Sequence, residues 1–195
     1  FIDLTRDTRR GGTYGALHQM AEGLARALLA EVQPGDRVGV WLSQSPWCAA
    51  AHLAIWKVGA ISVPLFKLFK HDALASRIND AGCAIVLTDA EGADLLGDLA
   101  TPWIASEVGI AGPPVEFADV GPEDPAVLIY TSGTTGTPKG ALNGHRVLSG
   151  HLPGVSVSHD HLGQTGDCLW TPAAWAWIGG LFDVAMPGRA LGQAV

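Results

Sequence analysis

Charged residues are scarce in this sequence. Lys and Arg number 12 and Asp and Glu number 19, which together make up 16% of the 195 residues and leave a net charge of −7. Little charge combined with 48% hydrophobic residues argues against a disordered chain, because disordered chains are rich in charge and poor in apolar residues. The shortage of cations argues against nonspecific nucleic-acid binding, which needs Lys and Arg to displace counterions from phosphates.

Cysteine is rare as well, with three residues in the chain. Cys48, Cys83 and Cys168 are far apart in the sequence, so they form no metal-ligand spacing, and three cysteines cannot all pair. We therefore expect reduced, buried thiols in a cytoplasmic protein.

Long apolar runs are also missing. A transmembrane helix needs roughly 18 or more consecutive apolar residues, and His52 and Lys57 interrupt the stretch 48–66, as Asp183 interrupts 173–186. We expect no membrane span. The first residues do not show the basic-then-apolar pattern of a secretion leader, which again favours the cytoplasm.

What the sequence does contain is an alternation of helix and strand patterns. Thr13 and Ser45 are suited to cap helices, Pro46 suits a first helical position, and Gly82 suits a helix end. The expected helices are 14–30, 46–59, 71–81 and a short one at 90–98, and the expected strands are 37–42, 60–63, 84–88, 103–105 and 126–130. Helices between apolar strands predict an α/β fold with layered helices around a largely parallel sheet.

The segment 109–125 differs from this pattern. It carries four prolines and four acidic residues and shows no apolar periodicity. Because another apolar strand pattern follows at once, we interpret the segment as a surface connection and not as a domain boundary.

The strand pattern 126–130 leads directly into the motif TSGTTGTPKG, from Thr131 to Gly140. Its glycines let backbone N–H groups approach an anion closely, its hydroxyls donate hydrogen bonds to phosphate oxygens, and its lysine adds a mobile positive charge. The motif is not a Walker A loop, because Thr137 and Pro138 separate Gly136 from Lys139. The alternative, a plain Ser/Thr/Gly surface loop, is disfavoured by the preceding apolar strand.

This motif resembles the signature phosphate loop of the AMP-forming adenylating enzymes, which include acyl-CoA synthetases, luciferases and the adenylation domains of peptide synthetases. Further stretches with the same resemblance are 13–17 (TYGAL), 34–38 (PGDRV), 57–60 (KVGA) and 63–65 (VPL). The resemblance covers nearly the whole chain. It implies the N-terminal part of the adenylate-forming enzyme fold.

The resemblance also implies a reaction and a set of binding residues. A carboxylate would attack the α-phosphorus of ATP to give an acyl-adenylate and pyrophosphate, and coenzyme A would then release AMP. Preorganised donors stabilise the charge that builds on the leaving pyrophosphate, with Lys139 as an electrostatic helper. The residues implied to hold the β- and γ-phosphates are Thr131, Ser132, Gly133, Thr134, Thr135, Gly136 and Lys139.

Later motifs of the family do not occur in residues 1–195. Missing are the glutamate that binds Mg²⁺, the ribose-binding aspartate, the hinge and the C-terminal domain with its catalytic lysine. The resemblance thus implies an incomplete N-terminal AMP-binding domain that holds no catalytic residue and few Mg²⁺ ligands. The tail 187–195 has no capping signal, and we expect the isolated chain to be inert and to aggregate or assemble with copies of itself.

A second informative stretch is 169–180 (LWTPAAWAWIGG). Its tryptophans are equally consistent with a helix start that carries aromatic core residues. The stretch looks closest to the acetyl- and medium-chain synthetase branch, and the resemblance implies that Trp177, Ile178 and Gly179 border the acyl group. Gly179 would leave room for an acid larger than acetate. An acidic residue is expected where Ala174 stands, which departs from the pattern.

Four histidines follow the phosphate motif: His145, His151, His159 and His161. Their spacings give neither an i, i+4 pair nor an HExxH pattern, so solvated or hydrogen-bonded side chains are favoured over a metal site. A contact of the pair 145–146 with coenzyme A or the nucleotide stays open.

Three hypotheses therefore remain. The first is an ATP-dependent acyl-CoA synthetase, an acid–thiol ligase whose partners are a small carboxylic acid, ATP and coenzyme A. The second is an inert fragment that binds only phosphate. The third is the adenylation domain of a peptide synthetase, which the lack of an aspartate within 175–180 disfavours, because such pockets usually use one to hold an amine.

Overall fold

The computed structural model describes residues 2–3, 10–131, 138–164 and 166–195. Its main feature is a six-stranded sheet of order β6-β5-β3-β4-β7-β8, in which only β8 is antiparallel to its neighbour. The strands are β3 (Arg37–Trp41), β4 (Ile61–Pro64), β5 (Ile85–Thr88), β6 (Thr101–Ile104), β7 (Pro125–Thr131) and β8 (Lys139–Gly144). A separate antiparallel pair consists of β1 (Ile2–Asp3) and β2 (Arg10–Gly11).

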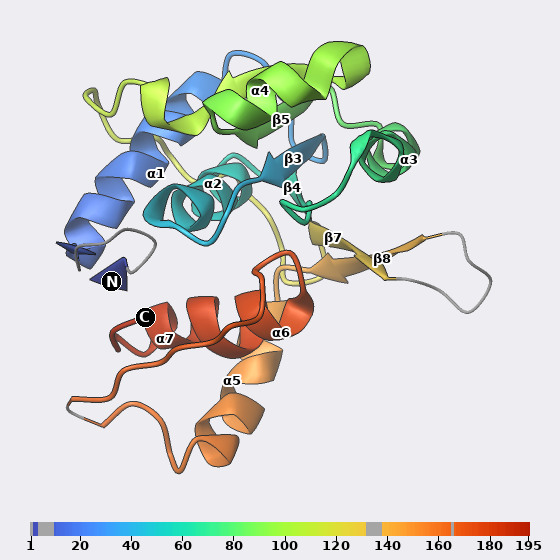
Figure 1. Ribbon diagram of the computed structural model, residues 1–195. Coiled ribbons are helices and arrows are strands. Elements are labelled where there is room, and N and C mark those ends of the chain that lie inside the picture. Colours follow the sequence, from blue (N-terminus) through green and yellow to red (C-terminus); the bar gives the residue numbers. More distant parts are fainter. Residues whose placement is uncertain (1, 4–9, 132–137, 165) are drawn as a thin grey trace.

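Helices connect the parallel strands and cover both faces of the sheet (Figure 1). They are α1 (Tyr14–Leu28), α2 (Pro46–Lys57), α3 (His71–Ala81), α4 (Ala90–Leu96), α5 (Val147–Ser158), α6 (Ile178–Gly180) and α7 (Met186–Ala190). Short 3₁₀ turns occur at η1 (Gly97–Leu99) and η2 (Ala105–Glu107), and the π-helical η3 (Leu181–Ala185) joins α6 to α7. The predicted α/β fold with a largely parallel sheet is confirmed.

Alternating side chains along each strand divide the core between the two faces. Val38 and Val40 of β3 pack with α1, α2 and the η3–α7 segment, whereas Trp41 packs with α3 and α4. In β5, Leu87 belongs to the first cluster and Val86 to the second. Successive side chains of a strand thus point to opposite faces and are buried on each, as a sheet covered by helices on both faces requires.

The expected signals set most of the helix ends. The Thr13 side chain accepts a hydrogen bond from the Ala16 N–H, and Ser45 accepts one from the Cys48 N–H with Pro46 at the first helical position. Gly82 ends α3 in the left-handed conformation with φ of 66°. Gly59 also has positive φ, 76°, and it lies beyond α2, which ends at Lys57 and not at 59 as expected.

Three other expectations need correction. Helix α1 ends at Leu28, earlier than 30, and α4 ends at Leu96, with a 3₁₀ turn up to Leu99. Strand β6 starts at Thr101 and includes Pro102, which the pattern 103–105 had left out. Proline is tolerated there because β6 is an edge strand, so the missing N–H leaves no ladder bond unmade.

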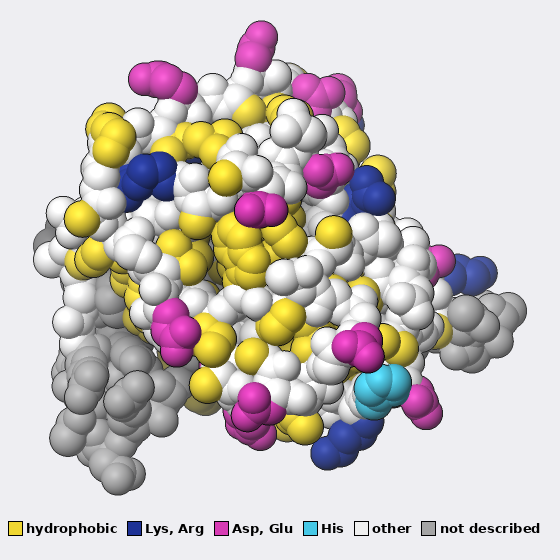
Figure 2. Space-filling view, turned by 90° about the horizontal axis from the view of Figure 1, so that it is seen from above, with side chains coloured by type: hydrophobic (Ala, Val, Ile, Leu, Met, Phe, Trp, Pro, Cys, Tyr) yellow, Lys and Arg dark blue, Asp and Glu magenta, His cyan; other side chains and the backbone are white. Residues whose placement is uncertain are grey.

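The segment 109–125 is mostly exposed, in agreement with its interpretation as a surface connection. It nevertheless packs against α1, because Val115 is buried and its N–H donates to Glu22 Oε2 at 2.7 Å. On the face above α4, acidic side chains are spread between apolar ones, and Lys and Arg form no stripe among the residues coloured in Figure 2. No helix in the described part of the chain is long and apolar enough to span a membrane.

Candidate functional site

The two ends of the Thr131–Gly140 motif face each other across a β-hairpin. Strand β7 ends at Thr131, β8 begins at Lys139, and these two residues are paired in register. Both are exposed, and the hairpin projects from the body of the molecule (Figure 1). The remaining implied phosphate ligands lie outside the described residues: Ser132, Gly133, Thr134, Thr135 and Gly136. The structure therefore places Thr131 and Lys139 together at the start and end of the loop.

A polar and aromatic cluster supports the base of this hairpin. Tyr130 is buried, and its hydroxyl donates to Asp80 Oδ2 at 2.6 Å. Burial and the hydrogen bond to Asp80 both raise the pKa of Tyr130, so the hydroxyl stays protonated and remains a donor at neutral pH. The Arg77 guanidinium lies 4.0 Å from the centroid of Phe69 and 5.9 Å from that of Tyr130. These contacts fix β7 immediately before Thr131.

The stretch 169–180 lies at the same edge of the sheet as Thr131. Gln44, which follows β3, donates from Nε2 to the Ala173 carbonyl at 2.8 Å. Phe66, which follows β4, has its ring centroid 6.0 Å from that of Trp177. Because β3, β4 and β7 are parallel, all three connections leave at the carboxyl edge, where open α/β sheets bind their ligands.

The predicted acyl-pocket residues lie at the start of α6. Trp177 is 40% and Ile178 39% exposed, and Gly179 is half-buried. Helix α6 begins at Ile178 and Trp175 packs against the core, but Trp170 is 72% exposed and Trp177 is not buried either, so the interpretation as a helix start with aromatic core residues holds for Trp175 alone. A Cβ atom added at Gly179 would lie 3.5 Å from Asp183 Oδ2, an ordinary contact, so a small side chain fits there.

Asp183 lies beside the predicted acyl-pocket residues and was not named by the sequence reasoning. It lies four residues after Gly179 on one continuous helical segment, so both face the same side, and this spacing is the signal that could have found it. His151 Nδ1 lies 2.7 Å from Asp183 Oδ1, which places an imidazole and a carboxylate beside the predicted acyl pocket.

Of the other three histidines, His159 is hydrogen-bonded, His145 is half-buried and His161 is exposed. His159 Nδ1 lies 2.9 Å from the Val155 carbonyl. Burial lowers the pKa of His145 although Asp124 opposes this shift. Arg146 pairs with Glu123 at 2.6 Å in an exposed ion pair just before α5. Within the described ranges, no group of three or more His, Cys, Asp or Glu side chains could hold a metal ion.

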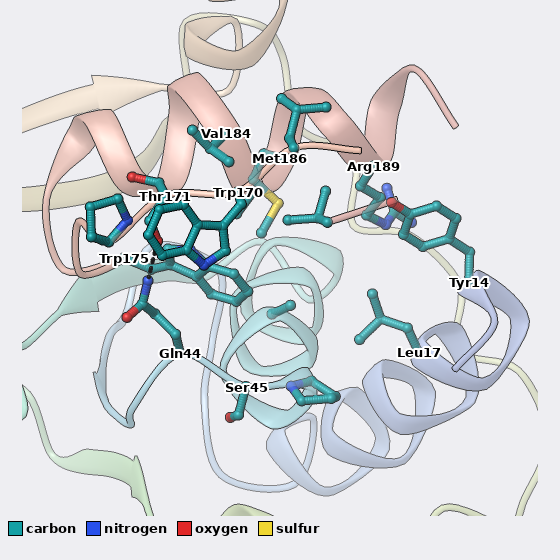
Figure 3. A pocket seen from close by; sticks show the side chains of 16 residues that line it. Tyr14, Leu17, Gln44, Ser45, Trp170, Thr171, Trp175, Val184, Met186 and Arg189 are labelled. Carbon is teal, nitrogen blue, oxygen red and sulfur yellow. Dashed lines mark hydrogen bonds between the residues drawn. The ribbon is translucent and has the colours of Figure 1, made fainter. Parts of the chain in front are cut away.

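A cavity of about 270 Å³ lies between α1, the start of α2, and the segments 169–175 and 184–189. Figure 3 shows Tyr14 and Arg189 at one end and Gln44, Trp170 and Trp175 at the other. Sequence reasoning did not predict this cavity, because its walls come from segments far apart in the chain. The tryptophans of 169–180 were the only local signal, and Trp170, although 72% exposed, forms part of the wall.

The fold and the hairpin define the class of protein. A fatty acyl-adenylate ligase from Legionella pneumophila superposes with a TM-score of 0.84 over 100% of this chain and 35% of that chain, and at 23% identity this likeness shows the fold alone. The fold is that of the N-terminal part of adenylate-forming enzymes. Residues 2–195 match the family described as AMP-binding enzyme, and the chain belongs to that family.

Two curated relatives show how much of a longer protein the chain represents. It is 40% identical over 147 residues to malpinin synthetase of Mortierella alpina. This alignment covers 70% of this chain and 2% of that protein. It is 30% identical over 209 aligned residues to acetyl-coenzyme A synthetase of Shewanella oneidensis. That alignment covers 86% of this chain and 31% of that protein. The chain thus spans less than a third of either relative.

Proposed function

We propose that this chain is the ATP-phosphate-binding region, and part of the acyl-binding region, of a cytoplasmic AMP-forming acyl-CoA synthetase. The enzyme would convert a carboxylate, ATP and coenzyme A into acyl-CoA, AMP and pyrophosphate through an acyl-adenylate. The observation that carries the proposal is the register of Thr131 with Lys139 in a chain of the AMP-binding enzyme family. Residues 1–195 would form an incomplete N-terminal domain, and the catalytic lysine would belong to another part of the protein.

The proposed chemistry assigns charge stabilisation to the loop. A carboxylate oxygen attacks the α-phosphorus, the bond to the bridging oxygen of the β-phosphate breaks, and the electron pair leaves with pyrophosphate. In the second step the thiol of coenzyme A attacks the acyl carbon, AMP departs with its electron pair, and the thiol proton is released. Lys139 is suited to the first step because its side chain is exposed beside the loop, where a mobile cation meets the developing charge. The described residues offer no cluster for Mg²⁺, so no step is assigned to the metal.

The acyl group would lie beside Trp177, Ile178 and Gly179. Support comes from their position at the carboxyl edge, where Trp177 contacts Phe66 after β4, the strand next to β7. The space next to Gly179 would accept an acid larger than acetate, since a side chain there would meet only Asp183 at contact distance.

ATP binding by the loop can be tested with a lysine pair. Lys139→Ala should weaken ATP binding by about tenfold to a hundredfold, because a hydrogen bond to a charged group contributes about 1.5–3 kcal/mol. Lys70→Ala removes another exposed lysine, at the start of α3, and should leave the affinity unchanged. Isothermal titration calorimetry measures both. Equal affinity of Lys139→Ala and the unaltered chain would remove Lys139 from the site.

Catalysis is tested by exchange of labelled pyrophosphate into ATP with a panel of carboxylic acids. We expect the isolated chain to show no exchange, because the catalytic lysine and the Mg²⁺ glutamate of the family are not among its residues. Exchange above background would show that residues 1–195 suffice and would contradict the fragment interpretation.

A second candidate function is adenylation of an amino acid within a larger synthetase. Asp183 favours it, because its carboxylate lies next to Gly179, where sequence reasoning expected no aspartate, and malpinin synthetase, of which the alignment covers 2%, is a much larger synthetase. Phenylalanine and 3-phenylpropionate, titrated with ATP present, separate the candidates because they differ only in the amine. Amine recognition predicts tighter phenylalanine binding that Asp183→Asn abolishes, whereas an acyl-CoA synthetase predicts tighter phenylpropionate binding.

A further inference from the structure

Trp177 and Tyr130, far apart in the sequence, are connected by a row of three side chains. The ring centroid of Phe66 lies 6.0 Å from that of Trp177, and the ring centroid of Phe69 lies 5.6 Å from that of Phe66. The Arg77 guanidinium then lies 4.0 Å from the centroid of Phe69 and 5.9 Å from that of Tyr130. Since Trp177 belongs to the predicted acyl pocket and Tyr130 directly precedes the phosphate motif, the Phe66–Phe69–Arg77 row connects the two predicted substrate sites.

The turn that carries both phenylalanines is fastened to the sheet. The Phe69 N–H donates to the Phe66 carbonyl at 2.9 Å, which brings the two rings together, and Trp41 Nε1 donates to the same carbonyl at 3.1 Å. Lys67 Nζ lies 2.6 Å from Asp89 Oδ1 and 4.6 Å from the ring centroid of Trp41. Contacts to the ends of β3 and β5 therefore fix the position from which both rings project.

The contacts along the row require aromatic rings and a cation. Phe66 and Phe69 meet edge to face at 85°, the arrangement that the charge distribution of aromatic rings favours. Arg77 is only 9% exposed, its Nη1 donates to the Ala73 carbonyl at 2.7 Å, and among the residues that the structure describes it forms no ion pair. A desolvated cation is attracted to a ring more strongly than an exposed one. An aliphatic side chain in place of Phe69 would fill space but make neither contact.

We propose that Phe69 is a positioning residue, which through Phe66 and Arg77 holds Trp177 and the start of the phosphate motif at a fixed separation. The proposal rests on the proposed function, because that function assigns the acyl group to one end of the row and the phosphates of ATP to the other. Attack of a carboxylate on the α-phosphorus needs both groups in one geometry, and a displacement of about 1 Å can cost about a hundredfold in rate. Phe69 touches neither substrate in this role and acts through its two neighbours.

Amide hydrogen exchange tests the positioning role without any ligand. Phe69→Leu keeps an apolar side chain but removes the ring. Exchange should become about fivefold faster both over 128–131 and over 176–178, since one ring pair and one cation–π contact are lost, each at the lower end of its range. Phe69→Tyr keeps the ring and should retain the slow exchange. Leu68→Ala, at a neighbouring position that is 73% exposed, should change neither segment.

ATP binding separates this proposal from the proposed function. A phosphate motif whose start is in place only part of the time binds ATP with an apparent affinity reduced by that fraction. Calorimetry should therefore show a loss of about fivefold in Phe69→Leu and none in Phe69→Tyr. A chain that binds no ATP would contradict the proposed function, and the exchange measurement would then decide the positioning role by itself.

Circular dichroism establishes which variants are folded, and Phe66→Leu, which interrupts the same row, replaces Phe69→Leu if that variant does not fold. Unchanged exchange in Phe69→Leu would show that apolar packing suffices and would overturn the proposal. Faster exchange in one of the two segments alone would overturn it as well, because the row would then not connect them. The same holds if Phe69→Tyr exchanges as fast as Phe69→Leu, or if a Phe69→Leu chain binds ATP with unchanged affinity.

Discussion

The carboxylate of Glu22 in α1 and the ammonium group of Lys57 in α2 form an ion pair in which each residue is only 7% exposed. The second carboxylate oxygen accepts from the Val115 N–H at 2.7 Å, and Lys57 Nζ lies 4.3 Å from the centroid of Phe117. One buried pair therefore joins two helices to the connection 109–125. Burial alone would raise the pKa of Glu22, but the hydrogen bonds from Lys57 and Val115 hold it below its usual value.

Removal of one partner should destabilise the fold. Glu22→Gln or Lys57→Met leaves the other charge buried and unpaired, which typically costs about 3–5 kcal/mol. The double variant should lose less than the two single losses added together, since no unpaired charge remains. Urea unfolding followed by circular dichroism measures the three free energies. Additive losses would show that the two side chains act independently.

The stability of the protein should fall on acidification because of His52. This side chain is fully buried in α2, its ring centroid is 5.6 Å from that of Trp56, and neither ring nitrogen has a hydrogen-bond partner among the described residues. Burial lowers the pKa of His52 from 6.5 to about 3. The unfolded chain therefore binds a proton that the folded chain rejects. The contribution to stability is complete above pH 6.5 and is lost as the pH falls toward 3, with about 2 kcal/mol lost at pH 5.

A neutral replacement isolates this effect. His52→Leu cannot titrate, so its free energy of unfolding should change about 2 kcal/mol less between pH 7 and pH 5 than that of the unaltered protein. His71→Gln, at an exposed position, should keep the original pH dependence. Urea titrations of the three proteins at the two pH values give the three differences needed. The same pH dependence in His52→Leu would show that His52 is protonated in the folded state.

Two glycines of α1 should respond in opposite ways to replacement by alanine. A Cβ at Gly23 would lie 2.7 Å from the Gly109 carbonyl oxygen and 2.8 Å from Ile110 Cα, and this backbone has to move. A Cβ at Gly15 would meet only the Thr13 hydroxyl oxygen, at 3.6 Å. Alanine is favoured over glycine in helices by about 1 kcal/mol, so Gly15→Ala should stabilise the protein by up to that amount. Gly23→Ala should destabilise it by about 1–3 kcal/mol, because overpacking outweighs the propensity. Thermal melts compare the pair, and a stabilised Gly23→Ala would contradict the close approach of segment 109–110 to α1.

The amide of Gln44 should hold the segment 171–173 in place. Its Nε2 donates to the Ala173 carbonyl at 2.8 Å and lies 3.4 Å from the Thr171 carbonyl oxygen. Gln44→Glu replaces the donor with a carboxylate that faces two carbonyl oxygens, which should cost about 1–2 kcal/mol. Amide hydrogen exchange over 170–177 should become faster, whereas Gln33→Glu in an exposed turn should not change it. Unchanged exchange in Gln44→Glu would assign the order of this segment to packing alone.

The order of helices and strands could be predicted because the signals that specify it are local. Caps such as Thr13 and Ser45, the left-handed Gly82, and apolar strands such as 84–88 act within a few residues of their own position. The alternation of these elements then limits the topology to a largely parallel sheet. The role of the phosphate motif stays a prediction, which rests on residue type and spacing.

Strand β8 could not be predicted from its sequence. Its residues, KGALNG, include two glycines and an asparagine, which are poor strand formers, and they are mostly exposed. They form a strand because β7 supplies the hydrogen-bonding partners along the whole hairpin. Pairing therefore overrides a weak local preference, and only the three-dimensional structure shows it.

The sequence by itself determined the succession of elements, the α/β class and the phosphate motif with Lys139 at its end, since these depend on local backbone and side-chain chemistry. Tertiary structure alone decided that Glu22 pairs with Lys57, that Asp183 lies beside Gly179, and that Arg189 stands without an ion pair among the described residues at an apolar cavity. These relationships depend on which segments, far apart in the chain, bury their apolar surfaces together. No local pattern carries that information, because the free energy of burial does not depend on separation along the sequence.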